Sequence, residues 1–556
     1  MPEITGVGVS PGRAVGPLVR MPDPVTEPSR DSRLVEGADA EAEAERIVAA
    51  AARVRDELDA RAARAHGDGK AVLEATALMA ADPTLVGAAQ QKVAAGLTSA
   101  RAVWEAADEV AAMLTSLGGY MAERARDVAD VRDRIVAELS GLPAPGVPDR
   151  VEPFVLAAHD LAPADTATLD PATCVALVTA EGGPTSHTAI LARALGLPAV
   201  VSAPGVLDVA EGTVVLVDGA AGVVRTDPTA DDIEQVRKVA ARARTFDGMG
   251  RTADGRRVQL LANIGDPTGV AAAVEANAEG VGLFRTEFCF LGHTEAPTVD
   301  EQVTAYRAVL AAFPGKKVVV RTLDAGADKP LPFLNLADEA NPALGMRGLR
   351  TVTRSEGVLT DQLTAIAAAA AAEGAEVWVM APMVATADEA ADFVARCAAA
   401  GLATAGVMVE VPSAALTATH VLASAHFASI GTNDLSQYTM AADRLLGELA
   451  RLNDPWQPAV LRLIQLTCRA GAELDRPVGV CGEAAADPAL ACVLVGLGVT
   501  SLSMTPRSIP DVADVLRATS YEECARLSEL ALVAPNAATA RGDVRTQLPV
   551  LAELGL

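Results

Sequence analysis

The segment KVVVRTLD, residues 317–324, is a short apolar run that ends in charged residues. Its valines, Val318 to Val320, are β-branched, and a run of this length and composition predicts a buried β-strand. Arg321 and Asp324 follow where the strand is expected to end. The segment therefore predicts a strand that has polar side chains at its carboxyl end.

Seven further runs of this kind follow Arg251, with stretches of helical spacing between them. The eight runs are residues 257–263, 280–288, 317–324, 376–384, 405–412, 426–434, 476–483 and 499–506. One intervening helix has a start signal, the capping box Thr386–Glu389. Eight β-α alternations predict a (β/α)₈ TIM barrel over residues 251–556, with a doubly wound open sheet as the alternative.

Polar residues stand at the carboxyl ends of these predicted strands. They are Arg285, Glu287, Arg321, Asp324, Glu410, Asn433, Asp434 and Cys481. In a barrel all carboxyl ends open on one face, where barrel enzymes have their active sites. Any one of these residues could simply be the solvated start of a loop, but the whole set predicts one shared site.

The charges predicted at this face have both signs. Arg285, Arg321 and, after Asp434, Arg444 are permanently charged and suit phosphate and carboxylate oxygens. Glu410 and Asp434 could hold Mg²⁺, a hard ion that takes one or two protein carboxylates and fills its shell with water and substrate oxygens. Each residue alone could be a salt bridge, a turn former or a helix cap. Together they predict a small anionic ligand that has both phosphate and carboxylate oxygens.

Cys481, in GVCGEAA, has two interpretations. A free cysteine is usually a small buried hydrophobe. A thiol with its ordinary pKa stays mostly protonated at neutral pH, so at the barrel mouth it could donate a proton to a carbanion or enolate, or act as a nucleophile. Its predicted position at the barrel mouth favours a role in catalysis over a role as a buried hydrophobic residue.

The amino-terminal half has a different pattern. Residues 31–139 mix alanine, charge and apolar residues at helical spacing. Short extended segments flank this block, and one predicts a hairpin around Asp218–Gly222. We therefore expect an α/β domain, residues 1–30 plus 140–225, with a helical subdomain, residues 31–139, inserted in it. A helical linker, residues 226–250, then leads to the barrel.

His187 is one of only six histidines, and it lies in EGGPTSHTAILARALGLPAVV, residues 181–201. A predicted strand, a glycine turn and a helix start place it beside free backbone N–H groups. The positive end of a helix lowers the pKa of an imidazole, which keeps it neutral and nucleophilic, and also favours a phosphoryl group. This pattern suits a phosphorylated histidine; a helix-capping or core histidine is the alternative.

Composition excludes several classes of protein. A formal charge of −26 with no basic stripe disfavours nucleic acid as a partner. No apolar run reaches the length of a membrane span, and residues 1–20 lack the pattern of a signal peptide, so we expect no membrane insertion. Seven cysteines without CxxC pairs fit a reducing compartment, which predicts a cytoplasmic protein.

Seven blocks in order resemble enzyme I of the bacterial sugar phosphotransferase system, the phosphoenolpyruvate-protein phosphotransferase family. They are GGPTSHTAILAR (182–193), GVGLFRTEF (280–288), VVRTLDAGADKPLP (319–332), NPALGMRGLR (341–350), GVMVEVPSAA (406–415), SIGTNDLSQYTMAADR (429–444) and GVCGEAAADP (479–488). Pyruvate phosphate dikinase and phosphoenolpyruvate synthase share the phosphohistidine and barrel blocks. Those relatives carry a large ATP-binding domain before the histidine domain, for which the first 150 residues leave no room.

The resemblance implies a swivelling phosphohistidine domain and a barrel that binds phosphoenolpyruvate and Mg²⁺. It implies that the phosphoryl group passes to His187 and then to a histidine of the phosphocarrier protein HPr. The matching motifs imply substrate binding by Arg285, Arg321, Asn433 and Arg444, metal binding by Glu410 and Asp434, and protonation of the pyruvate enolate by Cys481.

The resemblance also implies a homodimer formed through the barrel and HPr docking on the inserted helices. The candidate HPr contacts are Glu74, Leu78, Met79, Asp82 and Leu85, although a helix-bundle core would have the same Leu and Met spacing. Pro184 departs from the family pattern, because many relatives carry a basic residue just before Thr-Ser-His. A charge that could help to hold phosphate near His187 is therefore missing.

Two other functions fit part of the pattern. One is a barrel lyase or mutase that acts on phosphoenolpyruvate or a related keto acid, with a structural His187. The other is a scaffold that binds HPr-like partners after losing its chemistry. The scaffold hypothesis predicts broken site motifs, and the blocks above are unbroken.

Overall fold

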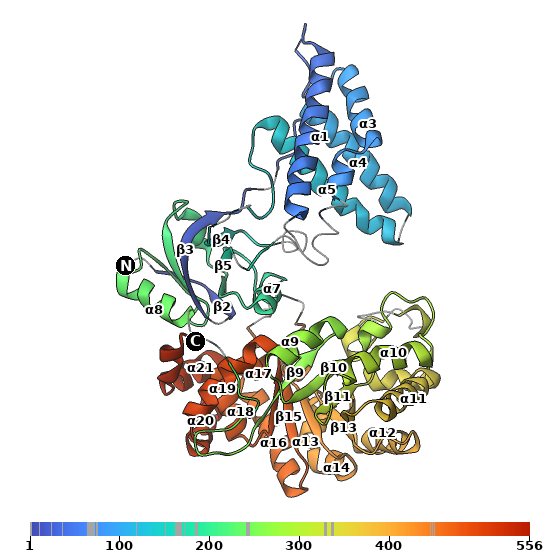
Figure 1. Ribbon diagram of the computed structural model, residues 1–556, viewed down its shortest axis with the longest axis vertical. Helices are drawn as coiled ribbons and strands as arrows, with labels where there is room; N and C mark the ends of the chain where they lie inside the picture. The colour runs from blue at the N-terminus through green and yellow to red at the C-terminus, as the bar shows by residue number, and fades with distance from the viewer. Residues whose placement is uncertain are drawn as a thin grey trace. The chain divides into compact units, whose positions relative to one another are not determined.

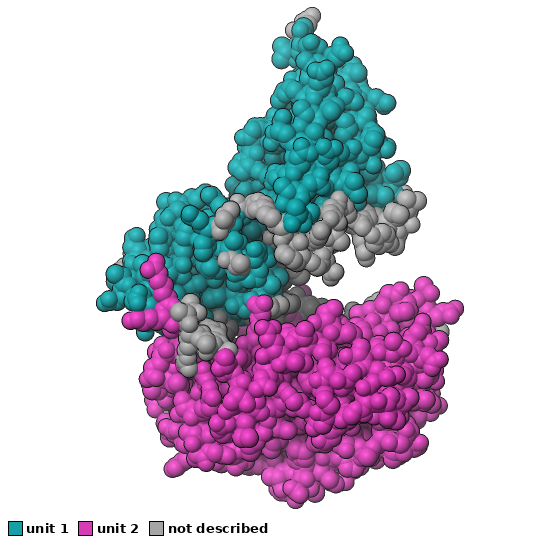
Figure 2. Space-filling view, in the orientation of Figure 1, with its two compact units in different colours: residues 1–236 teal, residues 237–556 magenta. Residues whose placement is uncertain are grey.

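The computed structural model describes residues 3–10, 12–23, 25–35, 37–63, 73, 76–117, 119–148, 150, 152–161, 169–171, 173–183, 187–240, 245–326, 331–334, 339–444, 446, 449 and 451–556. For residues 115–117, 119–126, 187, 190, 193–194, 240 and 483 it describes the backbone alone. The chain divides into two compact units, residues 1–236 and 237–556 (Figure 2).

Unit 1 contains an eight-stranded mixed sheet in the order β1-β8-β7-β3-β4-β5-β6-β2 (Figure 1). The strands are β1 (Glu3–Thr5), β2 (Val7–Ser10), β3 (Arg13–Arg20), β4 (Phe154–Ala158), β5 (Cys174–Thr179), β6 (Ala199–Val201), β7 (Val214–Asp218) and β8 (Val223–Thr226). The central strands β3 to β6 are parallel. Helix α7 (His187–Leu195) connects β5 to β6 and packs Ala189 and Ala192 against one face of the sheet.

The predicted hairpin around Asp218–Gly222 is confirmed. Strands β7 and β8 pair antiparallel, with Asp218 opposite Val223. The Asp218 carboxylate accepts hydrogen bonds from the backbone N–H groups of Ala220 and Ala221, at 3.2 and 2.8 Å, which closes the turn.

The segment between β3 and β4 forms helices α1 (Ala40–Ala62), α3 (Pro83–Ala94), α4 (Ser99–Leu117) and α5 (Gly119–Ser140). Ile47 and Leu58 of α1, Leu85 of α3 and Val103 of α4 meet in a shared apolar core. Alanine lowers the conformational cost of the helices, and this buried stripe supplies the packing that holds them together. After β8, α8 (Ala230–Ala240) begins with Asp231 and Asp232 in its first turn.

Unit 2 is a closed barrel of eight parallel strands (Figure 1). They are β9 (Gln259–Ile264), β10 (Gly280–Arg285), β11 (Lys317–Arg321), β12 (Glu376–Ala381), β13 (Ala405–Val409), β14 (Ala428–Gly431), β15 (Val478–Cys481) and β16 (Ser501–Met504). Each predicted apolar run overlaps one of these strands. The last strand, β16, pairs with the first, β9, so the barrel prediction is confirmed and the open sheet is wrong.

Helices connect and surround the barrel strands. They are α9 (Val270–Glu275), α10 (Val299–Leu310), α11 (Glu356–Ala372), α12 (Ala387–Ala399), α13 (Pro412–Leu416), α14 (Ala418–Ser424), α15 (Thr432–Met440), α16 (Pro458–Glu473), α17 (Glu483–Ala486), α18 (Pro488–Gly496), α19 (Ile509–Ala518), α20 (Tyr521–Val533), α21 (Ala537–Thr546) and α22 (Val550–Leu554). Helix α12 begins with the predicted capping box, in which Thr386 and Glu389 bond reciprocally. None of the helices among the described residues is both long and apolar enough to cross a membrane.

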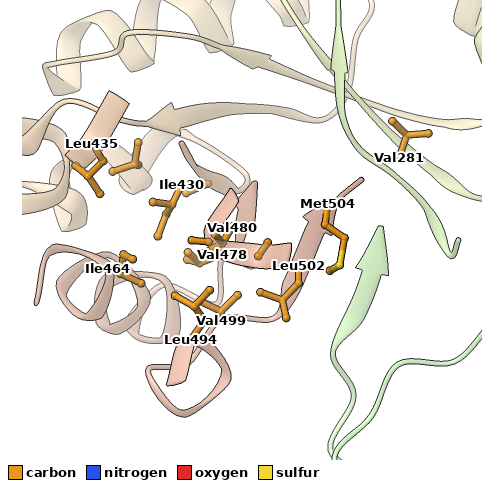
Figure 3. Close-up of a cluster of buried hydrophobic side chains, with 14 of the residues drawn as sticks. Val281, Ile430, Leu435, Ile464, Val478, Val480, Leu494, Val499, Leu502 and Met504 are labelled. Carbon is orange, nitrogen blue, oxygen red and sulfur yellow. The ribbon is translucent and has the colours of Figure 1, made fainter. Parts of the chain in front are cut away.

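Strand alternation sends side chains to two different cores. On β15, Val478 and Val480 join the outer core beside Ile464 of α16 and Leu494 of α18 (Figure 3). Cys481 points the other way, into an inner cluster with Leu283, Val319, Met380, Met408 and Phe427. This inner cluster packs the barrel interior next to Cys481, and the charged side chains emerge at the strand ends.

Candidate active site at the carboxyl end of the barrel

The strand ends bring the predicted barrel residues to one face. Arg285, Arg321 and Cys481 are the last residues of β10, β11 and β15, and Glu410 directly follows β13. Helix α15 begins immediately after β14, so Asn433 and Asp434 lie in its first turn. Arg444 follows α15 and forms an ion pair with Asp434 at 3.6 Å. The structure thus places these residues, which were identified from sequence, at the same end of the barrel.

Arg321 is held between two carboxylates. Its Nη2 donates to Glu287 Oε1 at 2.7 Å, and its Nη1 pairs with Asp324 Oδ2 at 2.9 Å. Burial alone would lower the pKa of the Arg321 guanidinium, but the charges of Glu287 and Asp324 raise the pKa above its usual range. Among the described residues, Arg321 Nε and Glu287 Oε2 are buried without a hydrogen-bond partner. The site therefore holds a fixed cation whose Nε donor has no partner among the described residues.

A network behind Arg321 fixes the backbone at the ends of β10 and β11. Thr286 donates its hydroxyl to the Arg321 carbonyl at 2.8 Å, and Gln362 of α11 donates to Thr286 Oγ1 at 3.0 Å. Gln362 Oε1 also accepts from the Leu323 N–H at 2.9 Å. All these groups are buried, so this hydrogen-bonded frame gives the charged residues little freedom to move.

Arg347 is a central residue that the sequence reasoning missed. Its guanidinium, 3% exposed, bonds both Asp324 oxygens at 3.2 Å and Asp434 Oδ1 at 2.9 Å. Burial would lower the pKa of Arg347, but Asp324 and Asp434 raise it. Tyr438 also accepts from Arg347, at 3.3 Å, and donates to the Ala343 carbonyl.

The signal for Arg347 was present in the block NPALGMRGLR. The residue was passed over because it lies in the long segment between β11 and β12 and not at a strand end. A backbone bridge between Gly326 and Arg347 brings this segment back to the end of β11. Glycine is needed there, because a Cβ at position 326 would lie 2.9 Å from the Arg347 Cβ.

Glu410 is a buried carboxylate among other carboxylates. It is 1% exposed, and its Oε1 accepts from the Met383 N–H at 2.6 Å. Burial, together with the charges of Asp434 and Asp324, raises the pKa of Glu410 to about 8. A Cβ at Gly431 would lie 2.8 Å from Glu410 Oε2, so the glycine leaves room for this carboxylate. Such an oxygen-rich group of acids favours a hard cation.

Cys481 lies at the top of the inner cluster and is 2% exposed. Its Sγ accepts from Ser429 Oγ at 3.4 Å and donates to the Ile430 carbonyl at 3.6 Å. Burial raises the pKa of the thiol. A protonated thiol beside an anion site is suited to donating a proton, and a nucleophilic thiolate is not favoured here.

In unit 1, His187 is the first residue of α7, as the sequence predicted. Its side chain and Pro184 lie outside what the structure describes. Thr188, the next residue, is buried and donates to Asp160 Oδ1 at 2.7 Å, while its hydroxyl accepts from the Leu161 N–H at 3.2 Å. These bonds tie the start of α7 to the segment that follows β4.

The candidate HPr contacts have different environments. Leu78 is 76% exposed and Met79 is half-buried. The Asp82 carboxylate caps α3 by accepting from the Thr84 and Leu85 N–H groups. Leu85 is buried in the helical core, which does not favour a role in binding, and Glu74 lies outside the described residues.

Three family models match successive parts of the chain. The N-terminal model of the PEP-utilising enzymes matches residues 5–124, and their mobile-domain model matches residues 151–222. The PEP-binding-domain model of the same enzymes matches residues 239–521, which include every candidate site residue of the barrel.

The chain is also similar to named proteins over nearly its whole length. It is 53% identical to a phosphoenolpyruvate-protein phosphotransferase of Streptomyces coelicolor, over 97% of this chain and 98% of that protein. It is 40% identical to a protein of the same name from Haloferax volcanii, over 96% of this chain and 97% of the relative. A solution structure of an enzyme I protein is 32% identical, with a TM-score of 0.36, and covers 42% of this chain and 97% of that one.

Proposed function

The chain belongs to the phosphoenolpyruvate-protein phosphotransferase family, and we propose that it transfers the phosphoryl group of phosphoenolpyruvate to its own His187 and then to HPr. Pyruvate is released in the first step, which begins the sugar phosphotransferase system. The observation that carries this proposal is the constellation at the barrel mouth. Fixed arginines, two acids and a protonated thiol converge there, as transfer from a small phosphorylated enol requires.

The arginines of the mouth bind the anionic substrate. Arg285, Arg321 and Arg444, with Asn433, are the proposed substrate ligands. Arg285 is exposed, and among the described residues the Arg444 guanidinium has a single ion pair, with Asp434 at 3.6 Å, so both can turn to an incoming phosphate or carboxylate. Arg321 and Arg347 are locked by carboxylates, and we assign them to neutralising the charge that develops on the transferring group.

Glu410 and Asp434 are the proposed Mg²⁺ ligands. No group of three or more His, Cys, Asp or Glu side chains suited to a metal is found in the described part of the chain. Mg²⁺ commonly takes one or two carboxylates and completes its shell with water and substrate oxygens, which fits this pair. When bound, the ion supplies electrostatic stabilisation of the phosphate and enolate oxygens.

His187 is the proposed acceptor and Cys481 the proposed acid. Phosphoryl transfer to a neutral imidazole breaks the bond between phosphorus and the enol oxygen and leaves the enolate of pyruvate. The Cys481 thiol then gives its proton to C3 of the enolate, which makes a C–H bond and leaves a thiolate. This protonation favours transfer, because pyruvate is far more stable than its enolate.

The remaining assignments follow from the family. We assign residues 1–30 plus 140–225 to a mobile phosphohistidine domain and residues 226–250 to the linker about which it swings. Residues 31–139 would dock HPr, with exposed Leu78 and half-buried Met79 as the best-placed contacts. A homodimer through the barrel and a cytoplasmic location complete the proposal.

The test is an assay of pyruvate release from phosphoenolpyruvate with Mg²⁺, with and without HPr. The proposal predicts one equivalent of pyruvate per site without HPr and continuous release when HPr is present in excess. A lyase or phosphatase acting on phosphoenolpyruvate would release pyruvate continuously without HPr and would leave no phosphate on the protein. That result would reject the proposal.

A further inference from the structure

The barrel encloses a second polar region, beneath Cys481 and toward the amino ends of the strands. A cavity of about 20 Å³, partly open to solvent, lies there. Its lining includes Lys317 at the start of β11, Ser429 on β14, and Ser501 and Ser503 on β16. Lys317 and Ser501 are the first residues of their strands, so the cavity occupies the half of the barrel that is opposite the active-site mouth.

The cavity is large and polar enough for water. A buried water molecule needs roughly 10 to 15 Å³ of free space and two or more polar partners, and the serine hydroxyls supply such partners. Two glycines keep the space open. A Cβ at Gly479 would lie 2.5 Å from Ser501 Oγ, and one at Gly282 would lie 2.5 Å from Ser503 Oγ.

One lining residue connects the cavity to the proposed acid. Ser429 lines the cavity, and its hydroxyl donates to Cys481 Sγ at 3.4 Å. The two other serines do not make this contact among the described residues: Ser503 bonds the Ala262 carbonyl and Asn263 Oδ1, at 3.1 and 2.5 Å. Ser429 is therefore the link between the thiol and the space below it.

The other end of the cavity has a cation, Lys317, that forms no ion pair with a carboxylate in the part of the chain that the structure describes. Lys317 is 8% exposed, donates to Gln259 Oε1 at 2.6 Å and lies 4.5 Å from the centre of the Trp378 ring. Burial lowers the pKa of Lys317 to about 8, against the opposing charges of Glu376 and Glu279. An ammonium group with this pKa can release and recover a proton near neutral pH.

We propose that Cys481 regains its proton from below, through Ser429 and water in the cavity, with Lys317 as the donor at the amino end of the barrel. The proposal rests on the acid role of Cys481. After the thiol has protonated the enolate, the thiolate takes the hydroxyl proton of Ser429. Ser429 takes a proton from cavity water, the water takes one from Lys317, and the Lys317 amine recovers its proton from solvent. The active-site mouth can thus stay closed to water during the transfer.

The test is the exchange of the methyl hydrogens of pyruvate in D₂O, catalysed by the whole protein with Mg²⁺ and followed by NMR. Exchange requires Cys481 to take a proton from pyruvate, trade it for deuterium and return it, and it needs neither His187 nor HPr. Ser429→Ala should slow this exchange about tenfold or more. Ser503→Ala removes a hydroxyl from the same cavity that bonds Ala262 and Asn263 instead of Cys481, and this variant should exchange within about twofold of the wild type.

A second measurement separates proton supply from damage to the site. A single turnover uses the proton already on Cys481, so Ser429→Ala should be phosphorylated by phosphoenolpyruvate at the wild-type rate. Equal slowing of exchange and single turnover, or exchange unchanged in Ser429→Ala, would overturn the relay. Wild-type exchange in Lys317→Met would overturn the assignment of Lys317 as donor. Rapid exchange in Cys481→Ala would instead reject the acid role in the proposed function.

Discussion

Strand β11 carries two buried cations on its inner face, Lys317 at its first residue and Arg321 at its last. Arg321 contacts the carboxylates of Glu287 and Asp324, and their charges raise its pKa. Lys317 contacts an amide oxygen and an aromatic ring, and burial lowers its pKa to about 8. The two buried cations of one strand thus have pKa values that are shifted in opposite directions.

The difference shows that the two ends of the barrel are suited to different chemical roles. At the carboxyl end, charges are paired and fixed, which suits a site that must hold an anion without rearranging. At the amino end, Lys317 contacts an amide oxygen and no carboxylate among the described residues, so burial lowers its pKa and its proton dissociates more easily. The chemistry of each end follows from the partners of its cation and not from burial alone.

The largest effect on stability is expected when the carboxyl end of the barrel loses one of its paired arginines. Arg347→Met should leave Asp324 and Asp434 short of a partner and cost about 3 to 5 kcal/mol of unfolding free energy. Phosphorylation by phosphoenolpyruvate should also be lost. Denaturant titration measures the first effect. Arg350→Met is the matched control, because the bonds of Arg350 to described residues go to the neutral carbonyls of Leu344 and Gly345, and its loss should cost about 1 kcal/mol. Equal costs for the two variants would contradict the network.

The next effect concerns the thiol between the two ends. Cys481→Ala should slow phosphorylation of His187 by phosphoenolpyruvate by about 10² to 10⁴-fold, the usual range for loss of a general acid. Phosphoryl exchange between His187 and HPr involves no enolate, so its rate should stay near wild type. Rapid-quench measurement of both steps is the check. Similar slowing of both would mean that Cys481 supports the fold and is not an acid.

Removing the underpaired cation should stabilise the protein. Lys317→Met ends the burial of a charge and should add about 1 to 3 kcal/mol at pH 7. The unfolded chain holds this proton up to its ordinary pKa of 10.5, whereas the folded chain releases it near 8, so this group adds stability as pH rises between those values. The gain of the variant over wild type should therefore shrink across that window. A gain that is constant with pH would contradict the lowered pKa.

The smallest effect is expected when Lys317 at the amino end is given a carboxylate partner, as Arg321 has at the carboxyl end. Gln259→Glu places a carboxylate where Lys317 now contacts an amide oxygen, so the pKa of Lys317 should rise toward or above its usual value. Stability should change by only about 1 kcal/mol, because a buried pair gains little over its desolvation cost. NMR titration of the lysine Nζ measures the pKa directly. An unchanged titration near pH 8 would show that the partner does not set it.

The barrel could be predicted from sequence because its signal is local. Eight apolar runs such as residues 317–324 match the strands, and polar residues at their ends mark one face. The network of Arg347 could not be predicted in this way. Its position depends on a long segment that folds back onto β11 through the Gly326 bridge, which no periodicity records.

The exposure and contacts of individual side chains also could not be predicted from the sequence. Leu78 and Leu85 have the same type and a helical spacing, yet one is 76% exposed and the other 5%. Asp82, considered as a partner contact, instead caps a helix. The pairing of Ser429 with Cys481 needs the register of β14 against β15, where Ser429 stands opposite Gly479 and Gly431 opposite Cys481. Contacts of this kind are set by tertiary packing.

The most direct measurement of the central claim is the location of phosphate after incubation with labelled phosphoenolpyruvate and Mg²⁺. The account predicts an acid-labile, base-stable label that disappears in His187→Ala. The label should persist in His159→Ala, which changes an exposed histidine of the same unit. Label that survives in His187→Ala, or wild-type protein that releases pyruvate and never becomes labelled, would contradict the account.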